Sequence, residues 1–347
     1  MLSFLLAAAL AAAPARTDVA PGVHLFVTPP YGDVGLDGNS IAIVGTDGVL
    51  VFDANGTPAA AEAVIGEIRK LTDRPVKWLV ISHWHWDHWY GAEAYAAAFP
   101  GLAIVAHEKT AALMRGPAIE FNRPGLERDL PGYVAFLEAE SAKGGPDAAA
   151  ARHRLDDARA FLRAKKSVKH TFPTVTFRDR MEIAIGGRTV EVRHEEPAVT
   201  PGDAFLWLPR EKILASGDLL DHPITFALSC YPSGWIRTLE KLDALDAATI
   251  VPGHGAAMRD EAHLHATLDV LRELLERGKA ARERGLDPDA ARAEIGPRIA
   301  ALRDRVTGGD AALNAAFDVQ MVDWFLHRVW DECAGPLGDA IAPIPPR

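Results

Sequence analysis

Hydrophobic and polar positions along the chain follow two different periods, which alternate between blocks of strands and blocks of helices. Short apolar runs bounded by turn residues predict a first block of strands, at residues 23–27, 40–44, 49–52, 76–81 and 102–106. A second block of such runs follows, at residues 174–177, 182–185, 190–193, 204–208, 213–215 and 249–251. The run VKWLVI at 76–81 is almost continuously apolar, which indicates a strand covered on both faces.

Helical patterns occupy the sequence between and after these runs. Thr57 and Pro58 form a typical helix start, because threonine is a good N-cap and proline is favoured at the first helical position. Further helical segments are predicted at residues 92–98, 108–168, 233–245 and 259–334. Two strand-rich blocks flanked by helices predict a sandwich of two sheets with helices outside.

The first apolar run, residues 2–13, ends in Ala13-Pro14-Ala15, a pattern of small residues that permits cleavage after Ala15. We therefore expect a signal peptide at residues 1–15 and a periplasmic or secreted protein. No Lys or Arg precedes the run, so a misplaced start or an apolar N-terminal tail is the alternative. No apolar run approaches the roughly 20 residues of a membrane-spanning helix, so we expect no integral membrane span.

Composition and charge narrow the class of protein. With 48% apolar and 24% charged residues, the chain is globular. The 37 Lys and Arg against 47 Asp and Glu give a net charge of −10 without a polybasic cluster, so nucleic acid is not an expected partner. Cys230 and Cys333 are too few for a disulfide framework or a cysteine-based zinc site, and their pairing stays open. The thirteen histidines are left as candidates for metal chemistry.

The main chemical motif directly follows the strand at 76–81 and consists of His83, His85, Asp87 and His88. Imidazole and carboxylate are ligands that a divalent ion such as zinc accepts. If the backbone turns there, the four can surround one ion, or His83 and His85 can face one ion while Asp87 and His88 face a second, as two-metal hydrolysis requires. The alternative is a loop with surface histidines.

Two further candidates also follow apolar strands. Asp218 comes after the run at 213–215, and His254 comes after the run at 249–251. Each alone is ambiguous, since an aspartate after a strand is often a turn former and a single histidine is often structural. Together with the first motif, both favour metal ligation.

With these motifs the chain resembles the metallo-β-lactamase-fold hydrolases over about residues 20–260. The resemblance implies an α+β fold, an αββα sandwich with the metal site at one edge between the sheets. It makes Asp218 the bridging carboxylate and His254 the last histidine ligand. Aspartate at 218 is similar to the glyoxalase, lactonase and general hydrolase branches, whereas true β-lactamases tend to have cysteine or serine there.

The family's middle histidine ligand has no counterpart. The family segment reads His-Thr-Pro-Gly-Asp, whereas here Val199 begins the segment Val-Thr-Pro-Gly-Asp. Valine cannot bind a metal, so by this resemblance the first site keeps only His83, His85 and a share of Asp218. The second site keeps its whole set, which is Asp87, His88, Asp218 and His254.

We therefore expect one tightly bound ion in the second site and a weak or empty first site. Zinc is the default for such ligands, with iron or manganese as alternatives. If the first site were filled as tightly, the missing ligand would come from the side chains nearest in sequence, which are His194, Glu195 and Glu196.

The resemblance implies a metal-dependent hydrolase that cleaves a small ester, lactone, thioester or amide with metal-bound hydroxide. Asp87 and Asp218 are the expected catalytic residues, since Asp218 would bridge two metals and Asp87 would hold the hydroxide. With only the second site filled, its bound water would be the nucleophile, or a nearby base would activate it. The alternative is a catalytically impaired protein that keeps the fold and binds a metal or a ligand.

Aromatic residues near the motifs suggest a substrate pocket, because ligand pockets are mostly apolar. The candidates for its wall are Trp89, Tyr90 and Tyr231, whereas Trp84 and Trp86 fit the core at least as well. His222 is a candidate donor to a substrate oxygen, with a turn role before Pro223 as the alternative.

These expectations give two parts after the leader. Residues 16–258 form the metallo-β-lactamase-like domain, with a helical insertion at about 108–168 that is a candidate lid. Residues 259–347 form a C-terminal helical extension with an apolar stripe of Leu264, Leu268, Leu271 and Leu275. This stripe either docks on its own domain or forms a dimer interface.

Overall fold

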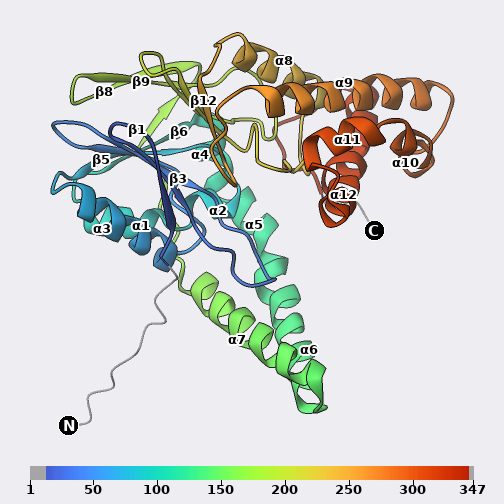
Figure 1. Cartoon of the computed structure of the whole chain (residues 1–347), viewed down its shortest axis with the longest axis horizontal. Coiled ribbons are helices and arrows are strands. Elements are labelled where there is room, and N and C mark those ends of the chain that lie inside the picture. The colour runs from blue at the N-terminus through green and yellow to red at the C-terminus, as the bar shows by residue number, and fades with distance from the viewer. Residues whose placement is uncertain (1–12, 344–347) are drawn as a thin grey trace.

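A computed structural model describes residues 13–343 of the chain, except for the side chain of Pro146 (Figure 1). Most of the predicted signal peptide lies outside these residues. In the described part of the chain, every helix is too short or too polar to cross a bilayer.

The first sheet has seven strands, in the order β1-β2-β3-β4-β5-β6-β7. Their bounds are Ala15–Ala20, Val23–Val27, Ser40–Val44, Val49–Phe52, Val76–Ile81, Ala103–His107 and Val175–Phe177. The pairs from β1 to β4 are antiparallel, and those from β4 to β7 are parallel. The apolar pattern does not predict β1, because its first four residues are exposed at the sheet edge.

The second sheet has five strands, in the order β12-β11-β10-β9-β8. Their bounds in chain order from β8 are Arg180–Ile185, Arg188–Arg193, Phe205–Leu208, Ile213–Gly217 and Thr249–Pro252. The pair β11–β12 is parallel, and the other pairs are antiparallel. Side chains of both sheets share one buried cluster, as with Ile43 and Val80 of the first sheet and Val192 and Leu206 of the second. The predicted sandwich of two mixed sheets with flanking helices is therefore confirmed.

Helices cover the outer face of each sheet. On the first sheet these are α1 (Pro58–Leu71) and α3 (Ala92–Ala98), and the hydroxyl of Thr57 accepts a hydrogen bond from the Ala60 amide at the start of α1. The second sheet is covered by α8 (Pro232–Asp243) and α9 (Ala262–Glu283). The metal motif itself continues into a single turn, α2 (Trp86–Trp89).

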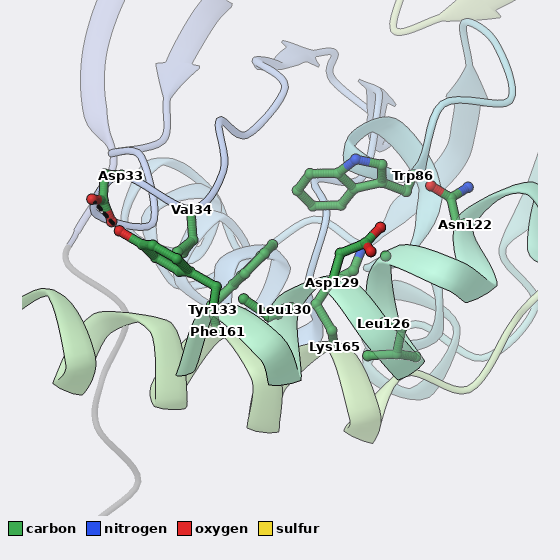
Figure 2. A pocket seen from close by; sticks show the side chains of 11 residues that line it. Asp33, Val34, Trp86, Asn122, Leu126, Asp129, Leu130, Tyr133, Phe161 and Lys165 are labelled. Atoms are coloured by element: carbon green, nitrogen blue, oxygen red, sulfur yellow. Dashed lines mark hydrogen bonds between the residues drawn. The ribbon is translucent and has the colours of Figure 1, made fainter. Parts of the chain in front are cut away.

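A helical insertion separates β6 from β7. It consists of α4 (Glu108–Met114), α5 (Pro117–Pro124), the π-helix η1 (Gly125–Asp129), α6 (Leu130–Ala142) and α7 (Pro146–Ser167). Helices α6 and α7 form a hairpin that projects from the sandwich (Figure 1) and has a small apolar core of its own, which includes Leu137 and Leu155. A cavity of about 490 Å³ lies at the base of this hairpin, between Phe161 of α7 and Trp86 of the metal motif (Figure 2).

The C-terminal extension continues from α9 through shorter helices that pack beside it (Figure 1). These are α10 (Pro288–Ile295), the 3₁₀ helix η2 (Gly296–Arg298), α11 (Ala300–Thr307), α12 (Ala311–Phe317), the π-helix η3 (Asp318–Asp323) and α13 (Trp324–Ala334). Leu264, Leu268 and Leu271 of the predicted stripe are buried in a core that α8 and α13 share. The stripe therefore docks on its own chain.

Candidate metal centre

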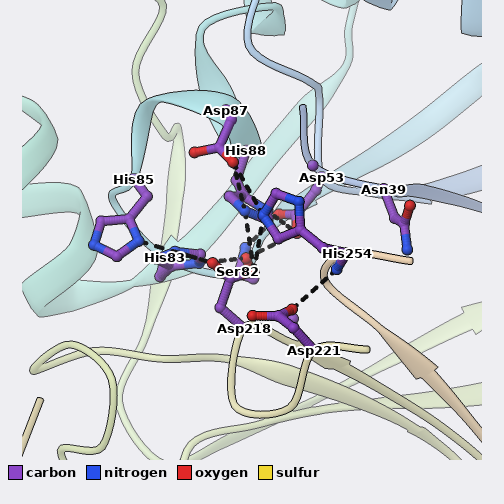
Figure 3. A network of polar contacts seen from close by, with 12 residues as sticks. Asn39, Asp53, Ser82, His83, His85, Asp87, His88, Asp218, Asp221 and His254 are labelled. Carbon is purple, nitrogen blue, oxygen red and sulfur yellow. Dashed lines mark hydrogen bonds and ion pairs between the residues drawn. The ribbon is translucent and has the colours of Figure 1, made fainter. Parts of the chain in front are cut away.

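The six predicted ligands come from the ends of three strands. The chain leaves β5 at Ile81 and turns through His83 and His85 into α2, which carries Asp87 and His88. Asp218 directly follows β11, where Gly217 has a positive φ of 53° that favours glycine, and His254 comes two residues after β12. The structure brings all six side chains together at this edge of the sandwich (Figure 3).

The Asp218 carboxylate lies at the centre of the cluster. Its oxygens are 3.3 Å from His83 Nε2 and 3.1 Å from His88 Nε2. His85 Nδ1 is farther away, at 3.8 Å. On the opposite side, His254 Nε2 lies 3.1 Å from Asp87 Oδ2 and 3.7 Å from Asp218. Asp218 is thus placed between a His83 and His85 side and an Asp87 and His254 side.

The donor atoms fit a divalent cation. Nε2 of His83, His85 and His88 and Oδ1 of Asp218 are buried without a hydrogen-bond partner among the described residues. Buried polar atoms without partners are costly unless something binds them, and imidazole and carboxylate are ligands for zinc, iron or manganese. The side chains include two sets of three whose donor atoms lie within 4.8 Å of one another in each set. These sets are His83, His88 and Asp218, and Asp87, His88 and His254.

A second layer of hydrogen bonds holds the histidines in place. Asp53, which has a positive φ of 63°, bonds through Oδ2 to His88 Nδ1 at 2.9 Å and accepts the Ser82 amide at 2.7 Å. The Ser82 hydroxyl lies 2.9 Å from His83 Nδ1. Because the Nδ1 atoms are occupied, the Nε2 atoms of His83 and His88 are directed at Asp218. Asn39 supports the other side, since its amide donates to the carbonyls of Pro252 and Gly255 on either side of His254.

Burial and neighbouring charges shift the pKa values of the ligands in opposite directions. Burial lowers the pKa of His83 to about 3, although Asp218 opposes this, so the ring is neutral and able to bind a metal. Burial acts to lower the pKa of His254 too, but Asp218 and Asp87 raise it to about 10. Burial acts to raise the pKa of Asp218, but His88, His83 and His254 hold it well below its usual range. The carboxylates are therefore ionised and available as ligands.

Val199 is fully buried in an apolar cluster, and its carbonyl accepts a hydrogen bond from the Ser229 hydroxyl. The three side chains considered as substitutes for a ligand here have other partners. His194 stacks on His107 with ring centroids 4.1 Å apart, and Glu195 pairs with Arg193. Glu196 pairs with Arg237 and Lys241.

Asp221 belongs to the cluster but was not predicted from the sequence. Its Oδ1 accepts the backbone amide of His254 at 2.9 Å, whereas its Oδ2 is buried without a partner among the described residues. It forms a third possible donor group with Asp218 and His254. Burial and the Asp218 charge raise the pKa of Asp221 well above its usual range. The one sequence signal was its position three residues after Asp218.

A cavity of about 360 Å³, here called the metal cavity, opens beside the cluster and is lined by His85, Asp87, Asp218 and His254. Its apolar wall consists of Leu36, Trp84, Trp86, Phe121, Phe226, Leu228 and Trp324. Phe121 belongs to the insertion and Trp324 to the C-terminal extension. Both additions to the sandwich therefore help to enclose the site.

The three residues predicted for the substrate wall and the predicted donor His222 do not line the metal cavity. Trp89 is fully buried and donates its indole N–H to the Trp84 carbonyl, and the Tyr231 hydroxyl donates to the Gly338 carbonyl. His222 is exposed and packs against His263. Tyr90 lines a different cavity, where its ring packs against that of His170 with centroids 5.0 Å apart. Cys230 and Cys333 are both free.

The family model of the metallo-beta-lactamase superfamily matches residues 33–254, and the chain belongs to that superfamily. It is a hydrolase of the metallo-β-lactamase fold with buried clusters of histidine and aspartate. Among characterised proteins it is similar to a linear primary-alkylsulfatase of Pseudomonas sp., with 25% identity over 259 residues. That match covers 70% of this chain and 47% of the alkylsulfatase, so the chain spans about half the length of this relative.

Solved structures show the same fold. A metallo-beta-lactamase from Pontibacter korlensis matches with a TM-score of 0.54 and 22% identity, over 75% of this chain and 99% of its own. A double mutant of the sec-alkyl sulfatase PisA1 matches with a TM-score of 0.60 and 15% identity, over 93% of this chain and 50% of its own. The likeness to PisA1 therefore extends beyond the family-matched residues 33–254 into the rest of the chain.

Proposed function

We propose that the protein is a metal-dependent hydrolase of a small ester, lactone, thioester or amide whose reacting group is uncharged. One observation carries this proposal: an apolar cavity opens beside histidine and aspartate atoms that have no hydrogen-bond partner among the described residues. Such a cavity can desolvate an acyl or alkyl group while it places the scissile bond beside the ligand cluster.

We expect the metal mainly in the second site. Asp87, His88, Asp218 and His254 would hold one ion tightly, with zinc as the default, whereas the first site would hold an ion weakly because Val199 adds no donor. When bound, a divalent ion supplies a nucleophilic water of lowered pKa and polarises the carbonyl oxygen. Asp87, which lines the metal cavity, is in place to orient that water, and Asp218 holds the two halves of the cluster together.

Charge favours an uncharged substrate group. The described residues around the metal cavity include no Lys or Arg, but they include the carboxylates of Asp87 and Asp218. Burying an anionic group there without a cationic side chain would carry a desolvation cost. An alkyl sulfate ester is the second candidate, because of the similarity to the alkylsulfatases and the aromatic wall, and in that case the metal itself would balance the sulfate.

The test combines metal analysis with three substrates. Protein purified without added metal is analysed for bound ions and then assayed on para-nitrophenyl butyrate, γ-butyrolactone and dodecyl sulfate. We expect close to one ion per chain and hydrolysis of the carboxylic ester or the lactone. Hydrolysis of dodecyl sulfate alone would favour the second candidate, and a bound ion without any hydrolysis would indicate an impaired metal-binding protein.

We further propose that the protein is exported, with the mature chain beginning near Arg16, because Ala13-Pro14-Ala15 suits a signal peptidase. Mass spectrometry of natively produced protein tests this. An intact N-terminus in the cytosolic fraction would contradict it.

A further inference from the structure

Lys165 is a partly buried cation beside the metal motif. It lies near the C-terminal end of α7, and its Nζ is 3.5 Å from the ring centroid of Trp86 and 4.3 Å from that of Tyr90 (Figure 2). Among the described residues, no carboxylate lies within ion-pair distance of this amine. Aromatic faces offset part of the cost of removing an ammonium from water, but they supply no counter-charge.

A cavity of about 310 Å³, here called the basic cavity, extends from Lys165. Its lining includes Arg123, Lys165, Lys166 and His170, against Glu127 as the one acidic side chain among the described lining residues. Of these, Arg123 pairs with Glu120, whereas Lys165 and Lys166 have no ion-pair partner among the described residues. The amines of Lys165 and Lys166 are therefore free to meet an anionic group of a ligand, as far as the described residues show.

The basic cavity adjoins the metal cavity, because both are lined by the same residue. Asn122 lines the basic cavity, the metal cavity and the 490 Å³ cavity at the base of the hairpin. The last of these is also lined by Lys165, but it contains the carboxylates of Asp33 and Asp129, which would repel an anion. An anionic group that extends past Asn122 is therefore directed toward Lys165 and the basic cavity.

We infer that the basic cavity binds a carboxylate at the end of the substrate remote from the scissile bond. This inference rests on the proposed function, because it places the reacting group in the metal cavity. The substrate class is then an amphiphilic ester, lactone or amide with an apolar middle and an anionic terminus. Burial lowers the pKa of Lys165 to about 7, although Asp87 and Asp37 oppose this, and a bound carboxylate would favour the charged form of the amine.

Binding of hydrolysis products tests the inference without any need for turnover. Isothermal titration of the zinc-loaded protein compares the monocarboxylates from hexanoate to decanoate with the dicarboxylates from adipate to sebacate, a series that covers different distances between the two ends. We expect one dicarboxylate to bind about tenfold more tightly than the monocarboxylate of equal length, as for one partly desolvated ion pair. The Lys165→Met variant should lose this preference, and Lys165→Arg should retain it.

The matched control is Lys169→Met, which removes a lysine of the same segment that does not line the basic cavity. It should keep the preference. Lys166→Met removes a lining charge and leaves the Lys165 amine over Trp86 and Tyr90 in place. It should reduce the preference, and it serves as a second variant if Lys165→Met does not fold. An equal preference in the wild type and Lys165→Met, or no preferred dicarboxylate in the series, would overturn the inference.

Two further arms separate the possible failures. A terminal sulfonate that binds as tightly as the carboxylate would overturn the assignment of a carboxylate. The monoester of adipate with para-nitrophenol, compared with para-nitrophenyl hexanoate, should show a lower KM that Lys165→Met abolishes. If neither ester is cleaved while the dicarboxylate preference persists, the proposed function fails and the basic cavity remains as a binding site.

Discussion

The two halves of the metal centre are built from the same kinds of residue but differ in how many donors they contain. Asp87, His88 and His254 meet Asp218 on one side, whereas His83 and His85 meet it on the other. The two halves share the Asp218 carboxylate. We propose that the first half lacks a donor because the buried Val199 stands at the position of the family's middle ligand, so that one apolar side chain limits how many ions the centre holds tightly.

The largest expected effect comes from removing a ligand of the complete half. Asp218→Ala and His254→Ala should each lower kcat/KM on a carboxylic ester by more than about hundredfold and should release the bound ion, because a first ligand contributes more than the 10–100-fold of a supporting residue. Assays and elemental analysis on the same samples measure both. His24→Ala, which removes a ring paired with Asp18 far from the cluster, is the control. Full activity in either ligand variant would contradict the assignment.

The two halves should also differ in how pH affects metal binding. His83 is already neutral because its pKa is about 3, whereas His254, with its pKa raised to about 10, holds a proton at pH 7 that a metal must displace. Burial acts to lower the pKa of His88, but the charges of Asp218, Asp87 and Asp53 raise it well above its usual range. Binding to the complete half should therefore release protons at pH 7, and the affinity should rise with pH. Calorimetry in buffers of different ionisation enthalpy measures this release. Its absence at pH 7 would mean that neither His88 nor His254 is a ligand.

A smaller loss of metal affinity is expected when the hydrogen bond that holds His88 is removed. Asp53→Asn replaces the carboxylate that bonds to His88 Nδ1 with an amide of the same shape. Metal affinity should fall by about 10–100-fold. Competition with a chelator of known affinity gives the value, and Asp47→Asn, on the exposed turn between β3 and β4, is the control. An unchanged affinity would show that Asp53 only shapes the loop.

The smallest expected effect, a change in metal content, tests the difference between the two halves most directly. Val199→His adds the missing donor and should raise the metal content from about one to about two ions per chain. The larger side chain enters a packed cluster, so thermal unfolding should show a loss of about 1–3 kcal/mol. Val199→Leu, which adds bulk without a donor, separates the two effects. If the wild-type protein holds two ions equally tightly, the first half is not missing a ligand and the interpretation is wrong.

The sequence predicted the parts of the fold that local patterns specify. The strand at 76–81 and the ligand motif after it follow from a continuous apolar run and from the residue types at its end. The pocket wall could not be predicted in this way, because Phe121 and Trp324 reach the metal cavity from segments more than 200 residues apart. Asp221 was missed for a related reason, since its role depends on the approach of His254 and not on its own neighbours in sequence.

The C-terminal extension contributes to the wall of the metal cavity but not to the predicted metal ligands. All six predicted ligands precede residue 255, whereas Gln320 and Trp324 close the metal cavity from η3 and α13. Part of the wall that limits which substrates fit therefore comes from a stretch of the chain that carries none of the predicted ligands. An engineer who wishes to change the substrate can vary these two positions, provided that Phe325, which packs on Trp235 of α8, is kept to anchor the helix.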